Sequence, residues 1–546
     1  MSPTRHTLPL LCLSVALLAL AGCGRREPAP APAAEPAPAP APAADAAATG
    51  GPHLPPGIAW FEGDVDAAFA AAKAANKPLF LFWGAEWCPP CAQIKSTIFA
   101  TREFQERSRL FVPVYLDGDT PSAQRQGERF GVVGYPTMIL FRPDGQEITR
   151  LPGGVDVARY ATILDTALQG ARPMLELLRA ATNGVAMEPA DWELLAYYSW
   201  STDAGKLVPA ADRVDIMGRL NQYCPRDRQP GECGRLYFEY LKALRASSKG
   251  GTWPLGAEAR SQSLVSLLRV LGAPAAVKAN VENLSYSATD VVGLLSEAGS
   301  PEREQLLLAW RAALDSLERG LEGVTLSGPE QINLYRARVQ LQRLEAPGAP
   351  LPATLLDPAR ATATRVVGAA PEGWARHAAA NAAVNLYLES DLDEEARDLL
   401  LAEIERSKSP YYFMLELADL AKKAGREQEA VTWLEAAWTG AAGPATRFQW
   451  GYNYLVGLIE MTPEDTARIE RVGLEVLGEL EGSPDAFYQR TRQRLEQLSG
   501  RLLEWSAGDE ARRAVVSKLR TRTAGVCAAL PADDAGRANC EAFLAG

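Results

Sequence analysis

The stretch Trp87-Cys88-Pro89-Pro90-Cys91 decides the fold of the first folded part of the chain. The apolar run Pro78-Leu79-Phe80-Leu81-Phe82-Trp83 precedes it and predicts a buried strand. Residues 92–99 follow it with apolar side chains at helical spacing. The two cysteines therefore lie at a strand-to-helix junction. The unpaired N–H groups and the dipole of a first helical turn favour a thiolate, and only a thiolate attacks a disulfide.

The cysteine pair is compatible with more than one kind of chemistry. A helix that starts at Cys88 puts Cys91 on the same face and within bonding reach. A zinc site needs about four ligands, but the chain has no second C-x-x-C and only three histidines, His6, His53 and His377. The strand-loop-helix setting and Trp87 favour a redox dithiol over half a zinc site or a structural disulfide. We therefore expect no metal and no bound cofactor.

The start of the chain has the pattern of a bacterial lipoprotein signal. Residues 1–22 carry Arg5 and then a run of Leu, Ala and Val that is short for a membrane span. The run ends in Leu20-Ala21-Gly22-Cys23, which resembles a lipobox. In that family the signal is cut before the cysteine, which is then lipidated, so Cys23 is the predicted lipid attachment site. An ordinary cleavage site with an incidental cysteine is the alternative.

Composition separates the rest of the chain into a linker and a long folded part. Residues 23–51 are mostly Ala and Pro and predict an extended spacer. The net charge is −11, from 56 basic and 67 acidic residues, and no basic cluster indicates nucleic acid. In an exported chain, the short separations of Cys224 from Cys233 and of Cys527 from Cys540 predict two local disulfides. Free buried thiols are the alternative.

Residues 52–170 predict an α/β domain with the element order βαβαβαββα. The expected strands are residues 58–61, 78–83, 110–116, 137–141 and 146–150, and the expected helices start at Asp64, Cys88, Ser122 and Val157. A Pro143-Asp144-Gly145 turn joins the last two strands.

This part of the chain resembles the thioredoxin superfamily, and within it the branch that contains the C-terminal domain of DsbD-type thiol-disulfide reductases and other exported thioredoxin-like proteins. The resemblance rests on Ala85-Glu86-Trp87-Cys88-Pro89-Pro90-Cys91 and Gly134-Tyr135-Pro136-Thr137, and it covers about a fifth of the chain. It implies a cis peptide bond before Pro136, which would face the dithiol. It also implies that Trp87, Tyr135 and Thr137 border an extended substrate strand. An ordinary strand-start proline is the alternative for Pro136.

The sequence departs from cytoplasmic thioredoxins at one position. These proteins carry a buried Asp six residues before the first cysteine, where it assists proton transfer from the second; here that residue is Phe82. Glu86 is the nearest carboxylate in sequence. It is either a proton relay to Cys91 or a solvated surface charge, and the general exposure of acidic residues favours the surface charge.

Residues 171–546 predict an all-α region, a helical repeat or a bundle. Residues 301–320 show clear helical spacing. A 34-residue period and small residues at Ala418, Ala430 and Ala437 resemble tetratricopeptide repeats around residues 375–445. A generic bundle with chance periodicity is the alternative. The aromatic residues Trp192, Tyr197, Tyr198 and Trp200 are expected in the core.

These features predict an exported thiol-disulfide oxidoreductase, anchored through Cys23 on the periplasmic side of a membrane, the outer more than the inner. Cys88 would attack a client disulfide from an exposed position, and a buried Cys91 would resolve the mixed disulfide. The resemblance favours a reductase or isomerase over an oxidase. The expected partners are disulfide-containing exported proteins and an upstream thiol donor such as a membrane reductase. The competing hypothesis is a helical-repeat binding scaffold or chaperone with a thioredoxin-like docking domain.

Overall fold

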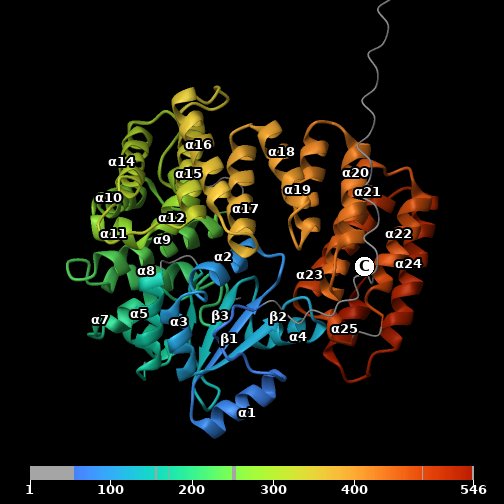
Figure 1. Cartoon of the computed structure of the whole chain (residues 1–546), viewed down its shortest axis with the longest axis horizontal. Coiled ribbons are helices and arrows are strands. Elements are labelled where there is room, and N and C mark those ends of the chain that lie inside the picture. Colours follow the sequence, from blue (N-terminus) through green and yellow to red (C-terminus); the bar gives the residue numbers. More distant parts are fainter. Residues whose placement is uncertain are drawn as a thin grey trace, which may run out of the picture. The chain divides into compact units, whose positions relative to one another are not determined.

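Four strands form one mixed sheet near the start of the described chain (Figure 1). The computed structural model describes residues 54–153, 157–170, 172–203, 205–248, 254–481 and 484–543. The predicted signal, the Cys23 lipid site and the whole Ala/Pro linker lie outside these residues. Among the described residues, no helix combines the length and the apolar character that crossing a bilayer requires.

The sheet has the strand order β2-β1-β3-β4. The strands are β1 (Leu79–Gly84), β2 (Val112–Asp117), β3 (Thr137–Phe141) and β4 (Glu147–Leu151). Strand β1 pairs in parallel with β2 and antiparallel with β3, and β3 pairs antiparallel with β4. The helices of this part are α1 (Val65–Ala75), α2 (Pro89–Thr97), α3 (Arg102–Arg107), α4 (Pro121–Phe130) and α5 (Val157–Leu168), with a 3-10 turn at Ser108–Leu110.

Alternation along β1 gives the sheet two differently covered faces. Leu79, Leu81 and Trp83 pack in one core cluster with side chains of α1 and α4. Phe80 and Phe82 pack in another with side chains of α2, α3 and α5. The cysteine pair belongs to the second cluster, so the α2 face of the sheet is the face of the redox centre.

The first strand predicted for this domain is wrong. Residues 58–61 do not form a strand: the segment contacts the sheet edge through a single backbone bond, from Phe61 N to the Pro113 carbonyl at 2.8 Å. Its aromatic side chains account for the error, because Trp60 packs against Phe82, Phe99 and Tyr115 without the backbone joining the sheet.

The rest of the chain is helical. Its helices are α6 (Met174–Thr182), α7 (Pro189–Ala196), α8 (Arg213–Tyr223), α9 (Pro230–Ser247), α10 (Ala257–Gly272), α11 (Pro274–Ala279), α12 (Val281–Tyr286), α13 (Ala288–Leu295), α14 (Pro301–Glu318), α15 (Gly328–Glu345), α16 (Ala353–Ala369), α17 (Trp374–Glu389), α18 (Asp393–Ile404), α19 (Pro410–Lys423), α20 (Glu427–Gly440), α21 (Pro444–Met461), α22 (Thr466–Gly478), α23 (Gln489–Ser506), α24 (Glu510–Ala528) and α25 (Ala535–Ala542), with a 3-10 turn at Pro484–Phe487.

Two disulfides fasten short loops of the helical region. Cys224 bonds Cys233 with Cα atoms 5.6 Å apart, and Cys527 bonds Cys540 with Cα atoms 5.5 Å apart. The four aromatic residues expected in the core, at positions 192, 197, 198 and 200, are all buried. Neighbouring helices from α17 to α21 pack against each other in sequence order, but their assignment to tetratricopeptide repeats stays a prediction.

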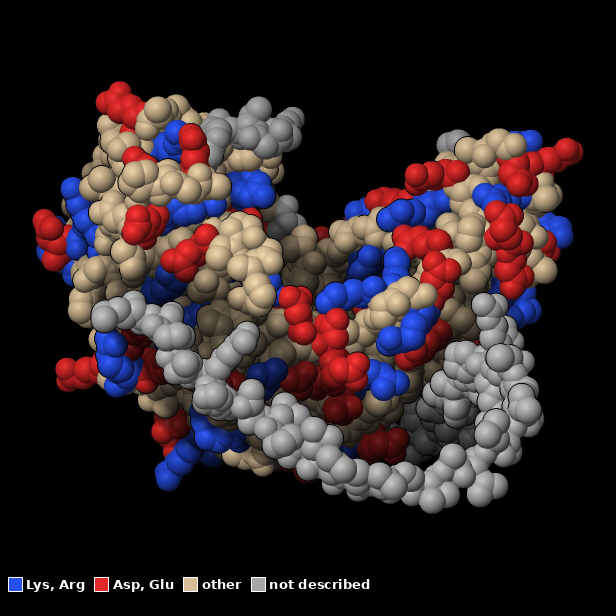
Figure 2. Space-filling model, turned by 90° about the horizontal axis from the view of Figure 1, so that it is seen from above, with Lys and Arg blue, Asp and Glu red and all other residues tan. Residues whose placement is uncertain are grey.

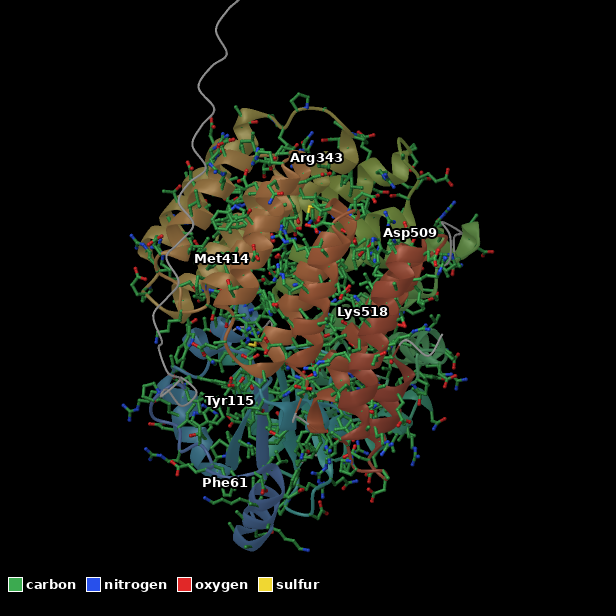
Figure 3. The ribbon with its side chains drawn as sticks, turned by 90° about the vertical axis from the view of Figure 1, so that its right-hand side faces the viewer. Phe61, Tyr115, Arg343, Met414, Asp509 and Lys518 are labelled. Atoms are coloured by element: carbon green, nitrogen blue, oxygen red, sulfur yellow. A yellow bond between two sulfur atoms is a disulfide. The ribbon has the colours of Figure 1, made fainter. Side chains whose placement is uncertain are left out.

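The helical region and the sheet domain share one core. The cluster that holds the cysteine pair continues through Trp450 and Leu498 to Cys540. The described residues accordingly belong to one compact unit, and the boundary predicted at residue 171 lies inside it. Figure 3 shows the consequence: Met414 of α19 lies on the helices directly above the sheet layer that carries Tyr115. The surface seen in Figure 2 carries interspersed acidic and basic side chains.

Candidate redox site

The cysteine pair lies at the N-terminus of α2, as the spacing predicts. Cys88 is the N-cap residue, and its Sγ accepts a hydrogen bond from Cys91 N at 3.1 Å. Pro89 and Pro90 occupy the first helical positions, where their missing N–H groups leave no bond unmade. The two cysteines form a disulfide with Cα atoms 5.2 Å apart. The dipole of α2 therefore acts on Cys88 when the pair is reduced.

The loop before β3 contains the cis peptide bond that the resemblance implies. The Tyr135–Pro136 peptide bond is cis. Thr137 is buried, and its hydroxyl donates a hydrogen bond to the Gly134 carbonyl at 2.8 Å. The Thr137 side chain therefore stabilises this loop and does not lie on an open surface. The Tyr135 hydroxyl donates to the Gly118 carbonyl at 3.1 Å, and burial raises its pKa to about 12.

The expectation that Cys88 is exposed is wrong for this structure. Cys88 is only 3% exposed and Cys91 is fully buried. The cover comes from the helical region, because α17 packs along α2 and α23 packs on α4. The sequence analysis predicted these helices as a separate domain, and so it did not predict that they cover the two thiols.

Trp87, next to Cys88, is the residue through which the redox site contacts these covering helices. Its Nε1 donates to Thr446 Oγ1 at 2.9 Å, and its carbonyl oxygen accepts a bond from His377 Nε2 at 3.0 Å. The rings of Tyr412 and Trp450 lie 6.2 and 5.0 Å from its ring. Side chains of the helical region thus occupy the surface on which the resemblance would place a substrate.

Arg490 and Asp119 complete the contact. The Arg490 guanidinium lies 4.9 Å from the Trp87 ring and 5.3 Å from the Tyr135 ring, and burial lowers its pKa. Burial raises the pKa of the Asp119 carboxyl to about 8. The Asp119 carbonyl oxygen accepts a bond from Ala445 N at 3.2 Å, at the start of α21. Trp87 and Tyr135 were expected at the site, but nothing in the sequence links Arg490 or Ala445 to loops more than 300 positions away.

Glu86 is not the solvated surface charge that its residue type favoured. Its Oε2 pairs with Lys95 Nζ at 3.0 Å, and its Oε1 accepts a bond from Trp374 Nε1 at 3.3 Å. Lys95 is 1% exposed and also lies over the rings of Tyr115 and Trp374, at 5.4 and 5.2 Å. A pocket of about 360 Å³, lined by Glu86, Trp374 and His377 among others, lies beside this pair.

This asymmetric burial predicts unequal effects of breaking the pair. Glu86→Gln removes the ion-pair partner of the buried Lys95 charge, so it should lower the free energy of unfolding by about 3 kcal/mol. Lys95→Met should cost only about 1 kcal/mol, because the Glu86 side chain is 29% exposed and can turn into the pocket. Urea unfolding of the two variants tests the order, and a larger loss in Lys95→Met would contradict it.

The comparisons with known proteins agree with the α/β part. Residues 65–168 match the family model of a thioredoxin-like domain. The chain is 31% identical over 107 residues to the thiol:disulfide interchange protein DsbD 1 of Pseudomonas aeruginosa, over 19% of this chain and 18% of that protein. It is 34% identical over 110 residues to DsbD of Cronobacter sakazakii, over 19% of each. The predicted fold class, a thioredoxin-like α/β domain followed by a helical region, is confirmed.

These matches are limited in extent. The chain spans less than a fifth of the length of these relatives. A bifunctional thioredoxin reductase/thioredoxin of Mycobacterium leprae is 37% identical over 86 residues, 16% of this chain and 18% of that protein. A solved structure titled DsbH oxidoreductase aligns with 23% of this chain and 95% of its own, at 17% identity and a TM-score of 0.19. The relatives therefore support thiol-disulfide chemistry for the thioredoxin-like part alone.

Proposed function

We propose that the chain is a thiol-disulfide oxidoreductase that exchanges disulfides with exported client proteins through Cys88 and Cys91. The observation that carries the proposal is the pair itself, bonded at the N-terminus of α2. The reduced Cys88 thiolate attacks a client disulfide and forms a mixed disulfide, and Cys91 displaces the client to restore the internal disulfide. The dithiol carries the electrons, so the reaction requires no bound cofactor.

The direction and the location of the reaction are further parts of this proposal. The similarity to DsbD-type proteins favours a reductase or isomerase, kept reduced by an upstream thiol donor such as a membrane reductase. The lipobox at Cys23 and the Ala/Pro linker favour a lipid-anchored protein on the periplasmic side, at the outer membrane more than the inner. Mass spectrometry of the native N-terminus tests the anchor, since an unmodified start at another residue would contradict it.

Burial of the dithiol favours a second candidate function. A thioredoxin-like domain whose thiols stay covered would act as a docking module for a helical scaffold or chaperone. Reduction of insulin by the full chain, with dithiothreitol as electron donor, separates the two functions. Turnover that Cys88→Ala abolishes supports the oxidoreductase. If dithiothreitol reduces insulin at the same rate with and without the protein, the result would support the scaffold function.

The cover predicts a variant that exposes Cys88. Gly443 has a φ of 87°, and an added Cβ would lie 3.0 Å from Asp119 Cβ and Cγ. Gly443→Ala should therefore lift the start of α21 from Asp119. A loss of about 1.4 kcal/mol in the stability of the closed arrangement relative to the open one should accelerate the alkylation of reduced Cys88 by iodoacetamide about tenfold.

Gly425→Ala is the matched control for this variant. Gly425 has a φ of 71° in the turn before α20, but an added Cβ would meet nothing within 4 Å. Both variants place a Cβ at a positive φ, with the greater backbone strain in Gly443→Ala because its ψ is 138°, and only Gly443→Ala also meets Asp119. Equal alkylation rates in the two variants would show that this contact does not hold the cover in place.

A further inference from the structure

Asp117 lies on the same face of the sheet as the buried dithiol. It is the last residue of β2, and it is paired in register with Gly84 of β1. Tyr115, two residues earlier, packs with Phe82 on the α2 face, with ring centroids 5.5 Å apart. Because side chains alternate along a strand, Asp117 shares that face with Tyr115.

Cys91 and Phe82 share the space over Gly84, and Phe82 Cζ would lie 2.9 Å from a Cβ added there. A Cβ added to Gly84 would lie 3.4 Å from Cys91 Sγ. Neighbouring strands lie about 4.8 Å apart, so the Asp117 side chain starts one strand spacing to the side of the position where the sulfur sits. Strand β1 itself offers no carboxylate on this face, since its side chains there are Phe80 and Phe82. Asp117 is thus the carboxylate that the fold brings beside the resolving thiol.

The groups around Asp117 suit a carboxyl that exchanges a proton. Its Oδ1 accepts a bond from Asp119 N at 3.0 Å, which fixes the carboxyl group. Burial raises its pKa, while the charge of Lys95 lowers it and the charge of Glu86 raises it. Tyr115 of β2, Asp119 of the following loop and Tyr411 of α19 are the other titratable groups that face it.

We propose that Asp117 is the proton acceptor for the Cys91 thiol during resolution of the mixed disulfide, an inference that rests on the proposed function. The Cys91 S–H proton passes to the Asp117 carboxylate, and Cys91 Sγ then attacks Cys88 Sγ. The Cys88–Cys91 bond forms and the bond from Cys88 to the client sulfur breaks. The protein dithiol is oxidised by two electrons, the client disulfide is reduced, and the leaving client thiolate takes up the proton.

The test uses the reduced full chain and dithiodipyridine, a small aromatic disulfide. Attack by Cys88 releases one thiopyridone and leaves a mixed disulfide, and resolution by Cys91 releases the second. In Asp117→Asn the second release should slow by about 10- to 100-fold near neutral pH, and the mixed disulfide should accumulate in intact mass spectra of acid-quenched samples. Asp117→Glu should recover part of the rate.

A thiol titration distinguishes proton transfer from structural damage. In the Cys88→Ser background, the ultraviolet absorbance of the thiolate reports the pKa of Cys91. Removal of a neighbouring carboxylate charge by Asp117→Asn should lower that pKa. Slower resolution together with a thiolate that forms more readily is expected from loss of a base. A distorted site, by contrast, would give slower resolution with a Cys91 pKa that is unchanged or raised, and this would overturn the proposal.

Asp144→Asn is the matched control, because Asp144 Oδ1 accepts a bond from Gln146 N at 3.0 Å in an exposed turn. The substitution keeps the same kind of local bond as Asp117→Asn, and it should leave both releases unchanged. Equal second releases in Asp117→Asn and the wild type at every pH would overturn the role of Asp117. A wild type that gives no second release, and reduces no insulin, would instead overturn the proposed function.

Discussion

Cys91→Ala should accumulate mixed disulfides with client proteins, whereas Cys88→Ala should abolish both turnover and trapping. Cys88 lies at the N-cap of α2, where the helix dipole and the Cys91 N–H stabilise its thiolate. Cys91 is fully buried and is bonded to the sulfur of Cys88. Attack therefore survives the loss of Cys91, but release of the client does not.

Non-reducing gels of each variant, expressed in its own host, measure this as high-mass bands that a reductant removes. The double variant Cys88→Ala/Cys91→Ala is the control for bands that form through other cysteines. Adding Gly443→Ala to Cys91→Ala should increase trapping, because clients must displace the helical cover first. Trapping by Cys88→Ala and not by Cys91→Ala would reverse the two roles.

The local chemistry of the redox centre was predictable because it is encoded in adjacent residues. An apolar run, two cysteines three positions apart and an amphipathic segment specify β1, the turn and α2 without reference to the rest of the chain. The strand and helix predictions at residues 137–141 and 157–168 agree with β3 and α5 for the same reason.

The environment of the centre was not predictable, because it depends on register and on distant packing. Asp117 followed by Gly118 resembles a turn that closes a strand, and only the pairing of β2 with β1 places its carboxylate beside Cys91. The cover over Trp87 depends on Thr446 and Arg490, which come from helices whose order in space no local pattern encodes. The sequence around Lys95 is typical of a solvated helix residue, but in the structure Trp374 and Glu86 enclose its side chain.

Asp119→Asn should stabilise the folded protein at alkaline pH and weaken the pH dependence of its stability. The carboxyl has a pKa of about 8 in the folded state because burial disfavours its charge, against an ordinary value of 3.8. Between these values the folded state holds a proton that the unfolded chain has released. The contribution of Asp119 to stability is therefore fully present below pH 3.8, and it is lost as the pH rises toward 8.

The size of the effect follows from that difference in pKa. The full shift corresponds to at most about 5–6 kcal/mol, and we expect about 2 kcal/mol, because the Asp119 side chain is partly exposed and solvent screens its charge. Urea unfolding from pH 5 to pH 8 measures it. Asp144→Asn, in an exposed turn, should leave the wild-type pH dependence unchanged.

The same ionisation should loosen the cover over the dithiol. The Asp119 side chain lies against Gly443 at the start of α21, and burial there raises its pKa, so a charged carboxylate disfavours the closed arrangement. Alkylation of reduced Cys88 should consequently rise more steeply with pH in the wild type than in Asp119→Asn, although its thiolate forms in both. If the alkylation rates of the wild type and Asp119→Asn rose in parallel with pH while their stabilities still differed, Asp119 would affect folding only. It would then have no role in controlling access to Cys88.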